Sequence, residues 1–64
     1  MICINGKQYD FEEKNLAEFL SEEQYRIETI AVERNEEIVP KSQYANTILH
    51  SGDVVEIVSF VGGG

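Results

Sequence analysis

The residues most open to chemistry are three consecutive glycines at the end of the sequence, Gly62, Gly63 and Gly64. A glycine run costs chain entropy and packs no side chain, so stability gives no reason for it. We expect a tail that is thin and flexible enough to enter a narrow channel and present a terminal carboxylate to another protein. Because a carboxylate is a poor electrophile, acyl chemistry at Gly64 requires activation, most plausibly as an adenylate made with ATP by a separate enzyme.

A glycine tail can also be a loose terminus, a linker or a truncation scar. Its position decides between these interpretations, because it follows the apolar stretch Val58-Ser59-Phe60-Val61 at the end of a domain-sized sequence. The functional interpretation is favoured. The sequence therefore predicts a single domain over residues 1–61 and a flexible tail over residues 62–64.

Two other side chains with chemical potential are a cysteine and a histidine. Cys3 has no second cysteine beside it, and a zinc site needs about four ligands, so we interpret it as a small apolar strand residue. His50 has no cysteine near it in sequence to activate, and His50 and Ser51 are interpreted as turn residues. The sequence predicts no metal site, no bound cofactor and no catalytic residue.

Charge limits the class of partner. Twelve Asp and Glu against five Lys and Arg give a formal net charge of −7, which repels nucleic acid and anionic membranes. Carboxylates on hairpins are usually solvated, yet four of them are expected to meet basic residues of a partner enzyme. These are Glu33, Glu36, Glu37 and Glu56.

Length and composition restrict the class further. The 64 residues are roughly half of a typical domain of about 100 to 150, and a domain this small buries only about 60% of its unfolded surface. That leaves no room for an enclosed pocket, which argues against a self-contained enzyme. No apolar run approaches the roughly 18 residues that cross a bilayer, the N-terminus lacks a secretion signal, and a lone cysteine fits a reducing cytoplasm.

The first half of the chain predicts a hairpin and a helix. Apolar residues alternate in the stretches 2–4 and 9–11, and Asn5-Gly6 between them supplies the positive φ angles of a tight turn. Asn15 can then cap a helix with Glu18 in a capping box, and Leu16, Phe19 and Leu20 follow at helical spacing. We place the end of this helix near Tyr25.

The second half predicts three further strands. A hairpin begins at Thr29, turns at Asn35-Glu36 and stops at Pro40, and a single helical turn follows around residues 42–44. After a turn at residues 51–53, the run 54–61 is apolar in both phases. Such a run is typical of a central strand that is covered on both faces, or of one with a face kept for a partner.

This order of elements predicts an α+β domain with one helix packed on one face of a mixed sheet of about five strands. Phe60 and Val58 share one strand phase, so a face without the helix would expose them as an apolar patch. They are the best candidates for partner contact, with Val61 beside them. The alternative, that both are core residues, stays open because the helix can lie over either face.

The final thirteen residues, 52–64, resemble the carboxyl end of the thiamin-biosynthesis sulfur carrier proteins, the ThiS family. Further matches are Ile4-Asn5-Gly6 in the first hairpin, Leu16 through Leu20 in the helix, and the stretch 32–40 in the second hairpin. The resemblance covers the whole chain. It implies the β-grasp fold of ubiquitin-like proteins.

The resemblance also implies a function. Gly64 matches the residue that a ThiF-type enzyme adenylates at the expense of ATP and that is then converted to a thiocarboxylate, with Gly62 and Gly63 threading the partner's channel. Cysteine is the ultimate sulfur source, through a sulfurtransferase or cysteine desulfurase. The acceptor is thiazole synthase, which builds the thiazole ring of thiamin.

Three alternatives remain at this level. The small subunit of molybdopterin synthase uses the same tail chemistry, but that family tends to be longer and to carry proline before its final glycines, whereas this chain has Phe60-Val61 there. A ubiquitin-like modifier would end as an isopeptide on a lysine. A binding module would leave the tail inert.

Overall fold

A computed structural model describes residues 1–60 of the chain, and Val61 and Gly62–Gly64 lie outside the described residues. The main sheet has five strands in the order β2-β1-β7-β4-β5, of which β1 and β7 run parallel while the other neighbours are antiparallel. Its strands are β1 (Ile2–Ile4), β2 (Lys7–Tyr9), β4 (Ile30–Arg34), β5 (Glu37–Val39) and β7 (Val54–Ser59).

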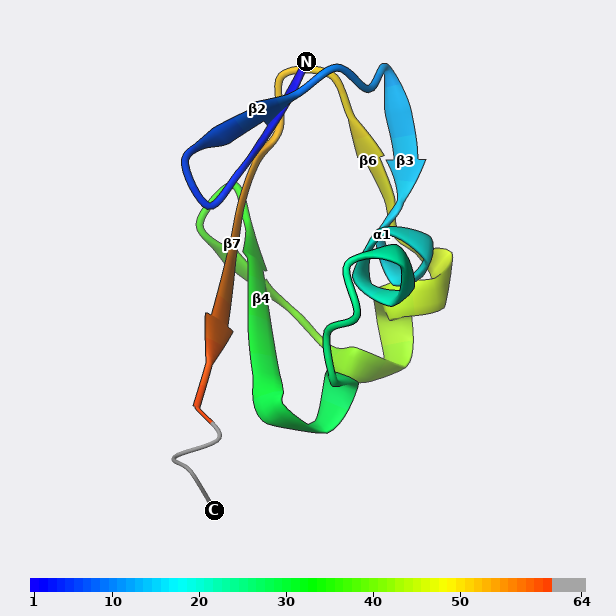
Figure 1. Cartoon of the computed structure of the whole chain (residues 1–64), viewed down its shortest axis with the longest axis vertical. Coiled ribbons are helices and arrows are strands. Elements are labelled where there is room, and N and C mark those ends of the chain that lie inside the picture. Colours follow the sequence, from blue (N-terminus) through cyan, green and yellow to red (C-terminus); the bar gives the residue numbers. More distant parts are fainter. Residues whose placement is uncertain (61–64) are drawn as a thin grey trace.

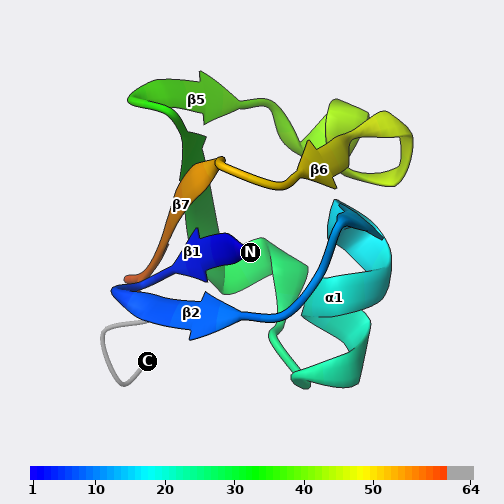
Figure 2. The ribbon, with the colours of Figure 1, turned by 90° about the horizontal axis from the view of Figure 1, so that it is seen from above.

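One helix, α1 (Leu16–Glu22), lies over one face of this sheet (Figures 1 and 2). Two 3₁₀ helices, η1 (Ile27–Thr29) and η2 (Lys41–Asn46), join the elements that follow α1. The prediction of a mixed sheet with one main helix on one face is therefore confirmed. None of the helices in residues 1–60 is long and apolar enough to cross a bilayer.

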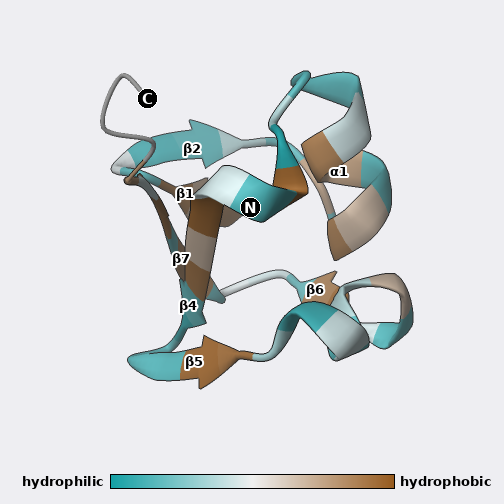
Figure 3. Ribbon diagram, turned by 90° about the horizontal axis from the view of Figure 1, so that it is seen from below, coloured by the Kyte–Doolittle hydropathy of each residue, from teal (hydrophilic) through white to brown (hydrophobic). Residues whose placement is uncertain are grey.

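The core lies between α1 and the sheet, and Figure 3 shows hydrophobic stretches on both α1 and β4. Leu16, Phe19 and Leu20 of α1 are each at most 2% exposed, which confirms the helical spacing read from the sequence. They pack with residues from the main sheet and η2 and with one residue from the stretch 48–50, namely Ile2, Ile4, Ile30, Val32, Tyr44, Leu49, Val55 and Ile57.

The ends of α1 follow from capping. The Asn15 side chain accepts a hydrogen bond of 2.9 Å from the Glu18 backbone N–H, as the sequence predicts. The predicted end near Tyr25 is wrong by about three residues, because Gln24 adopts a left-handed φ of 64° and the Tyr25 N–H bonds back to the Leu20 carbonyl. This is a Schellman cap, and a glutamine in place of the usual glycine hides it in the sequence.

Both predicted hairpins are present, and their turns use asparagine in the left-handed region. Asn5 and Gly6 have φ angles of 53° and 81°, and Asn35 and Glu36 have 52° and 72°. Paired positive φ angles give the turn geometry that matches the twist of the flanking strands. The helical turn expected around residues 42–44 is also confirmed as η2.

The structure also contains a second, two-stranded sheet that the sequence did not predict. It pairs β3 (Glu13–Asn15) with β6 (Ile48–His50) in antiparallel register. His50 is therefore the last residue of a strand, and its interpretation as a turn residue is wrong, whereas Ser51 does lie in a turn. Three-residue strands hold too few side chains to show a period of two.

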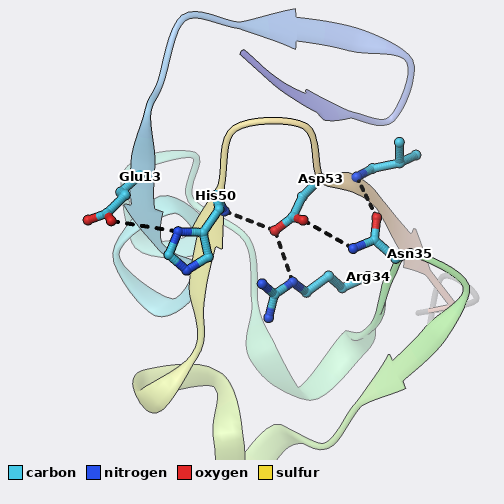
Figure 4. A network of polar contacts seen from close by, with 6 residues as sticks. Glu13, Arg34, Asn35, His50 and Asp53 are labelled. Carbon is cyan, nitrogen blue, oxygen red and sulfur yellow. Dashed lines mark hydrogen bonds and ion pairs between the residues drawn. The ribbon is translucent and has the colours of Figure 1, made fainter.

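Asp53 fastens the start of β7 to its neighbours (Figure 4). Its carboxylate accepts hydrogen bonds from the His50 N–H, from Arg34 Nε at 3.0 Å and from Asn35 Nδ2 at 3.1 Å. Burial acts to raise the pKa of this carboxyl, but the bonds from His50 and Asn35 and the charge of Arg34 outweigh it and hold the pKa below its ordinary value of 3.8.

Replacing Asp53 by asparagine should therefore lower stability in a pH-dependent way. Because the pKa of the folded state is depressed, the contribution of the carboxylate is complete above the ordinary value and is lost as pH falls through the folded pKa. We expect Asp53→Asn to cost about 1 to 2 kcal/mol at pH 7 and much less at pH 2. Urea unfolding of both proteins across this range measures the difference, and an equal cost at both pH values would contradict the assignment.

Candidate functional site

The candidate site is the face of the sheet that α1 does not cover, here called the open face. Along β7, Val55 and Ile57 are buried under α1, while Val54, Glu56, Val58 and Phe60 are exposed. The strand is central, since β1 and β4 flank it. β7 is therefore apolar in both phases because one of its faces packs on the core while the other presents valines to solvent.

Val58 and Phe60 are 53% and 58% exposed, so the alternative that they are core residues is excluded. The predicted exposure of both is confirmed, and their contact with a partner stays a prediction. Val61, Gly62, Gly63 and Gly64, the remaining predicted site residues, lie outside the described part of the chain.

The open face also contains apolar residues that sequence reasoning did not single out. Ile38 on β5 is 63% exposed and is in register with Glu33, while Val54 at the start of β7 is 49% exposed. Ala31 lies opposite Val58 on β4. Only the register of β4 with β5 and β7 brings these residues to one face, and the sequence does not contain that register.

Phe60 is fixed through its backbone while its ring remains accessible. Its N–H donates a hydrogen bond of 3.0 Å to the Thr29 carbonyl. Lys41 Nζ lies 5.9 Å from the ring centroid and donates to the Ile30 carbonyl at 2.6 Å. A cation beside the ring and a bonded backbone thus give Phe60, the residue that follows β7, a defined place.

Three of the four predicted acidic contacts gather in one hollow. Glu33 and Glu56 are direct partners in the β4–β7 register, and with Glu36, Asn35 and Val54 they line the hollow. Like charges placed opposite each other destabilise a sheet, so a basic group from outside would be favoured there. Glu37 is separate, because it is in register with Arg34, one residue out of phase with Glu33.

A second hollow lies near the β6–β7 turn, at the opposite end of the molecule from Phe60. Asp10, Glu12, Glu13 and His50 line it together with Phe11 and Ser51, and His50 Nδ1 is 3.6 Å from Glu13 Oε2. Within residues 1–60, no three His, Cys, Asp or Glu side chains are grouped to hold a metal ion. Cys3 is half-buried in β1, close to its predicted setting.

The geometry of residues 1–60 therefore supports binding. On the open face of β7, Val54 and Glu56 line the acidic hollow. After them comes a short apolar strip, Val58 and Phe60, which precedes the segment that ends in the three glycines. A partner that lies on this strip would meet the tail where it leaves the domain. The arrangement brings Val58 and Phe60 to one face with Glu33, Glu36 and Glu56, three of the four acidic residues of the sequence prediction. Cys3, in register with Val54, also lies on this face, whereas Glu37 and His50 lie outside it.

Comparisons with known proteins agree with this geometry. The model of the ThiS family matches residues 2–64. The sulfur carrier protein ThiS of Bacillus subtilis is 38% identical over 66 aligned residues, which cover all of both chains. The sulfur carrier protein ThiS of Thermus thermophilus is 36% identical, again over the full length of both.

A longer relative and a solved structure are also similar to this chain. A thiazole synthase of Paramagnetospirillum magneticum is 45% identical over 64 residues, and the match spans 98% of this chain but only 20% of that protein. The crystal structure of a thiamine biosynthesis protein (ThiS) from Geobacter metallireducens aligns with a TM-score of 0.78 at 33% identity. The alignment covers 98% of this chain and 97% of the Geobacter metallireducens chain.

Proposed function

The chain belongs to the ThiS family of sulfur carrier proteins, and we propose that it carries sulfur as a thiocarboxylate on Gly64 for the thiazole moiety of thiamin. In this role it is a protein cosubstrate without an active site of its own. Its size, the match over the full length of two sulfur carrier proteins and the solvent-facing apolar strip of β7 support the proposal.

The single observation that carries the proposal is the alternation along β7. A strand that only held the core together would have no use for exposed Val54, Val58 and Phe60. Val58 and Phe60 are neighbours on this face, and neighbouring apolar residues in solvent mark interaction surfaces. Here they lie on the strand that precedes the glycine tail in the sequence. A partner bound to them would therefore also be close to the reacting carboxylate.

The proposed chemistry takes place in the partners. A ThiF-type enzyme would bind the open face and join the Gly64 carboxylate to the α-phosphate of ATP with release of pyrophosphate. The outer sulfur of a persulfide, supplied from cysteine through a sulfurtransferase or cysteine desulfurase, would then attack the acyl carbon and displace AMP. A second thiol of the partner would cleave the resulting acyl disulfide, which leaves the thiocarboxylate on Gly64 and a disulfide on the partner. The carrier contributes the anchoring surface and the reach of its tail.

The acceptor separates this function from its nearest alternative. Thiocarboxylated carrier labelled with ³⁵S, incubated with thiazole synthase and its other substrates, should transfer label to the thiazole product. Incubated with the large subunit of molybdopterin synthase and its precursor, it should transfer none. Transfer only in the second reaction would assign the chain to molybdenum cofactor synthesis, and label in isopeptide-linked proteins would indicate a modifier.

Salt dependence tests the acidic hollow. With a net charge of −7, association with a basic activating enzyme should slow as salt rises from about 0.05 to 0.5 M. The double variant Glu33→Gln, Glu56→Gln should flatten this dependence, whereas Glu37→Gln, out of phase with the hollow, should change it little. Stopped-flow association rates give the comparison, and equal slopes for all three proteins would contradict a role of the hollow in docking.

A further inference from the structure

Two asparagines support the central strand from opposite sides. Asn5 lies in the β1–β2 turn and Asn35 in the β4–β5 turn, with φ angles of 53° and 52°. Each directs its side-chain amide at the backbone of β7. Asn35 Oδ1 accepts from the Val54 N–H at 2.9 Å, at the start of the strand, whereas Asn5 bonds to Ile57, three residues before Phe60.

The Asn5 side chain continues the parallel ladder between β1 and β7. Along this ladder the Cys3 N–H donates to the Asp53 carbonyl at 3.0 Å, and the Asn5 N–H donates to the Val55 carbonyl at 2.9 Å. The next step would involve Ile57, but the main chain turns away at Asn5-Gly6. The side-chain amide takes its place, since Oδ1 accepts from the Ile57 N–H at 2.6 Å and Nδ2 donates to the Ile57 carbonyl at 3.1 Å.

Because a side-chain amide replaces the main chain here, the end of β7 depends on Asn5 for its hydrogen bonds on this side. On the other side, β4 stays in register with β7 as far as Ser59, which lies opposite Ile30. Without the Asn5 amide, β7 would be bonded on one side only after Val55. A strand bonded on one side is a sheet edge, and its position is less well defined.

We propose that Asn5 is a positioning residue for the activation of the tail. Its amide fixes Ile57, and thereby sets where Val58 and Phe60 present their side chains and where the tail leaves the domain. Ile57 precedes Val58 and Phe60 in the chain, and on the other side these residues are held by β4 and by the Thr29 carbonyl. Loss of the Asn5 amide therefore leaves the docking residues supported from one side only. The inference rests on the proposed function, in which a partner reads this end of β7.

A matched pair of variants tests the role. Asn5→Gly and Gln24→Gly each place glycine at a residue with positive φ, and only Asn5→Gly removes an amide from β7. In adenylation assays with the ThiF-type enzyme at varied carrier concentration, Asn5→Gly should raise KM about 5- to 10-fold with kcat nearly unchanged, as expected for lost bonds that act on binding. Gln24→Gly should leave KM within about twofold, because Gln24 follows α1 and lies outside both the open face and the acidic hollow.

Hydrogen exchange supplies a readout that does not depend on the enzyme. The Ile57 amide should lose protection in Asn5→Gly and keep it in Gln24→Gly after correction for global stability. Asn5→Asp, which keeps an acceptor for the Ile57 N–H but has no donor for its carbonyl, should lie between the wild type and Asn5→Gly in both assays and serves if the glycine variant fails to fold.

Equal KM values for the two glycine variants, or an Ile57 amide that stays protected in Asn5→Gly, would overturn the positioning role. If either result is found and the wild-type carrier is still adenylated normally, the proposed function stands. Wild-type carrier that is never adenylated would overturn the proposed function, and the positioning role in activation with it.

Discussion

Replacing Phe60 by alanine should weaken binding to the activating enzyme by about 2 kcal/mol, or about 30-fold, while stability falls far less. The ring is 58% exposed and its residue is held by a backbone hydrogen bond to Thr29, which alanine preserves. Truncation therefore removes surface that a partner can bury and leaves the core intact. Binding by calorimetry and denaturant unfolding on the same samples measure the two effects.

Phe19 provides the matched control on the other side of the sheet. It is 2% exposed and packs edge-on against Tyr9 and Phe11, with ring centroids 5.2 and 6.2 Å away. Phe19→Ala should cost about 3 to 5 kcal/mol of stability. If Phe60→Ala unfolded as easily as Phe19→Ala and bound normally when folded, Phe60 would not belong to the interface.

Adding one alanine after Gly64 should abolish adenylation while the fold stays intact. The proposed chemistry consumes a free carboxylate at a fixed reach from Phe60, and one more residue moves that carboxylate by about 3.5 Å and adds a Cβ atom to the channel. Pyrophosphate exchange with the ThiF-type enzyme measures the loss. The same alanine placed before Met1 is the control, and it should leave exchange unchanged because the N-terminus lies at the opposite end of the molecule from the end of β7 (Figure 1).

Activation of the extended protein without prior trimming would contradict the assignment of Gly64. Loss of exchange in both extended proteins would point to a general defect. The unfolding midpoint of each protein separates these outcomes, because neither addition touches the core residues.

The local signals in the sequence are enough to predict most of the fold. Asn5-Gly6 and Asn35-Glu36 force left-handed turns, and Asn15 caps a helix whose apolar residues recur at helical spacing. These features act between near neighbours in the chain, so they can be read without the tertiary structure. The end of α1 could not be predicted in this way, because Gln24 adopts a left-handed conformation that is usually found at glycine.

Features that depend on the register of distant segments were not accessible. The β3–β6 sheet pairs residues about 35 positions apart, and each strand is too short to show its own pattern. The side of the sheet that α1 covers decides whether Phe60 is core or surface, and β7 is apolar in both phases. The separation of Glu37 from Glu33 and Glu56 likewise follows only from pairing between strands.

The central claim concerns one oxygen atom of the Gly64 carboxylate. Carrier isolated from the native host, or incubated with the activating enzyme, ATP and a sulfur source, should gain about 16 Da when oxygen is replaced by sulfur in acyl activation. Fragmentation in the mass spectrometer should place the gain on a C-terminal peptide that contains Gly64. An unchanged mass under conditions in which a known sulfur carrier is converted, or a gain placed elsewhere, for example on Cys3, would contradict the account.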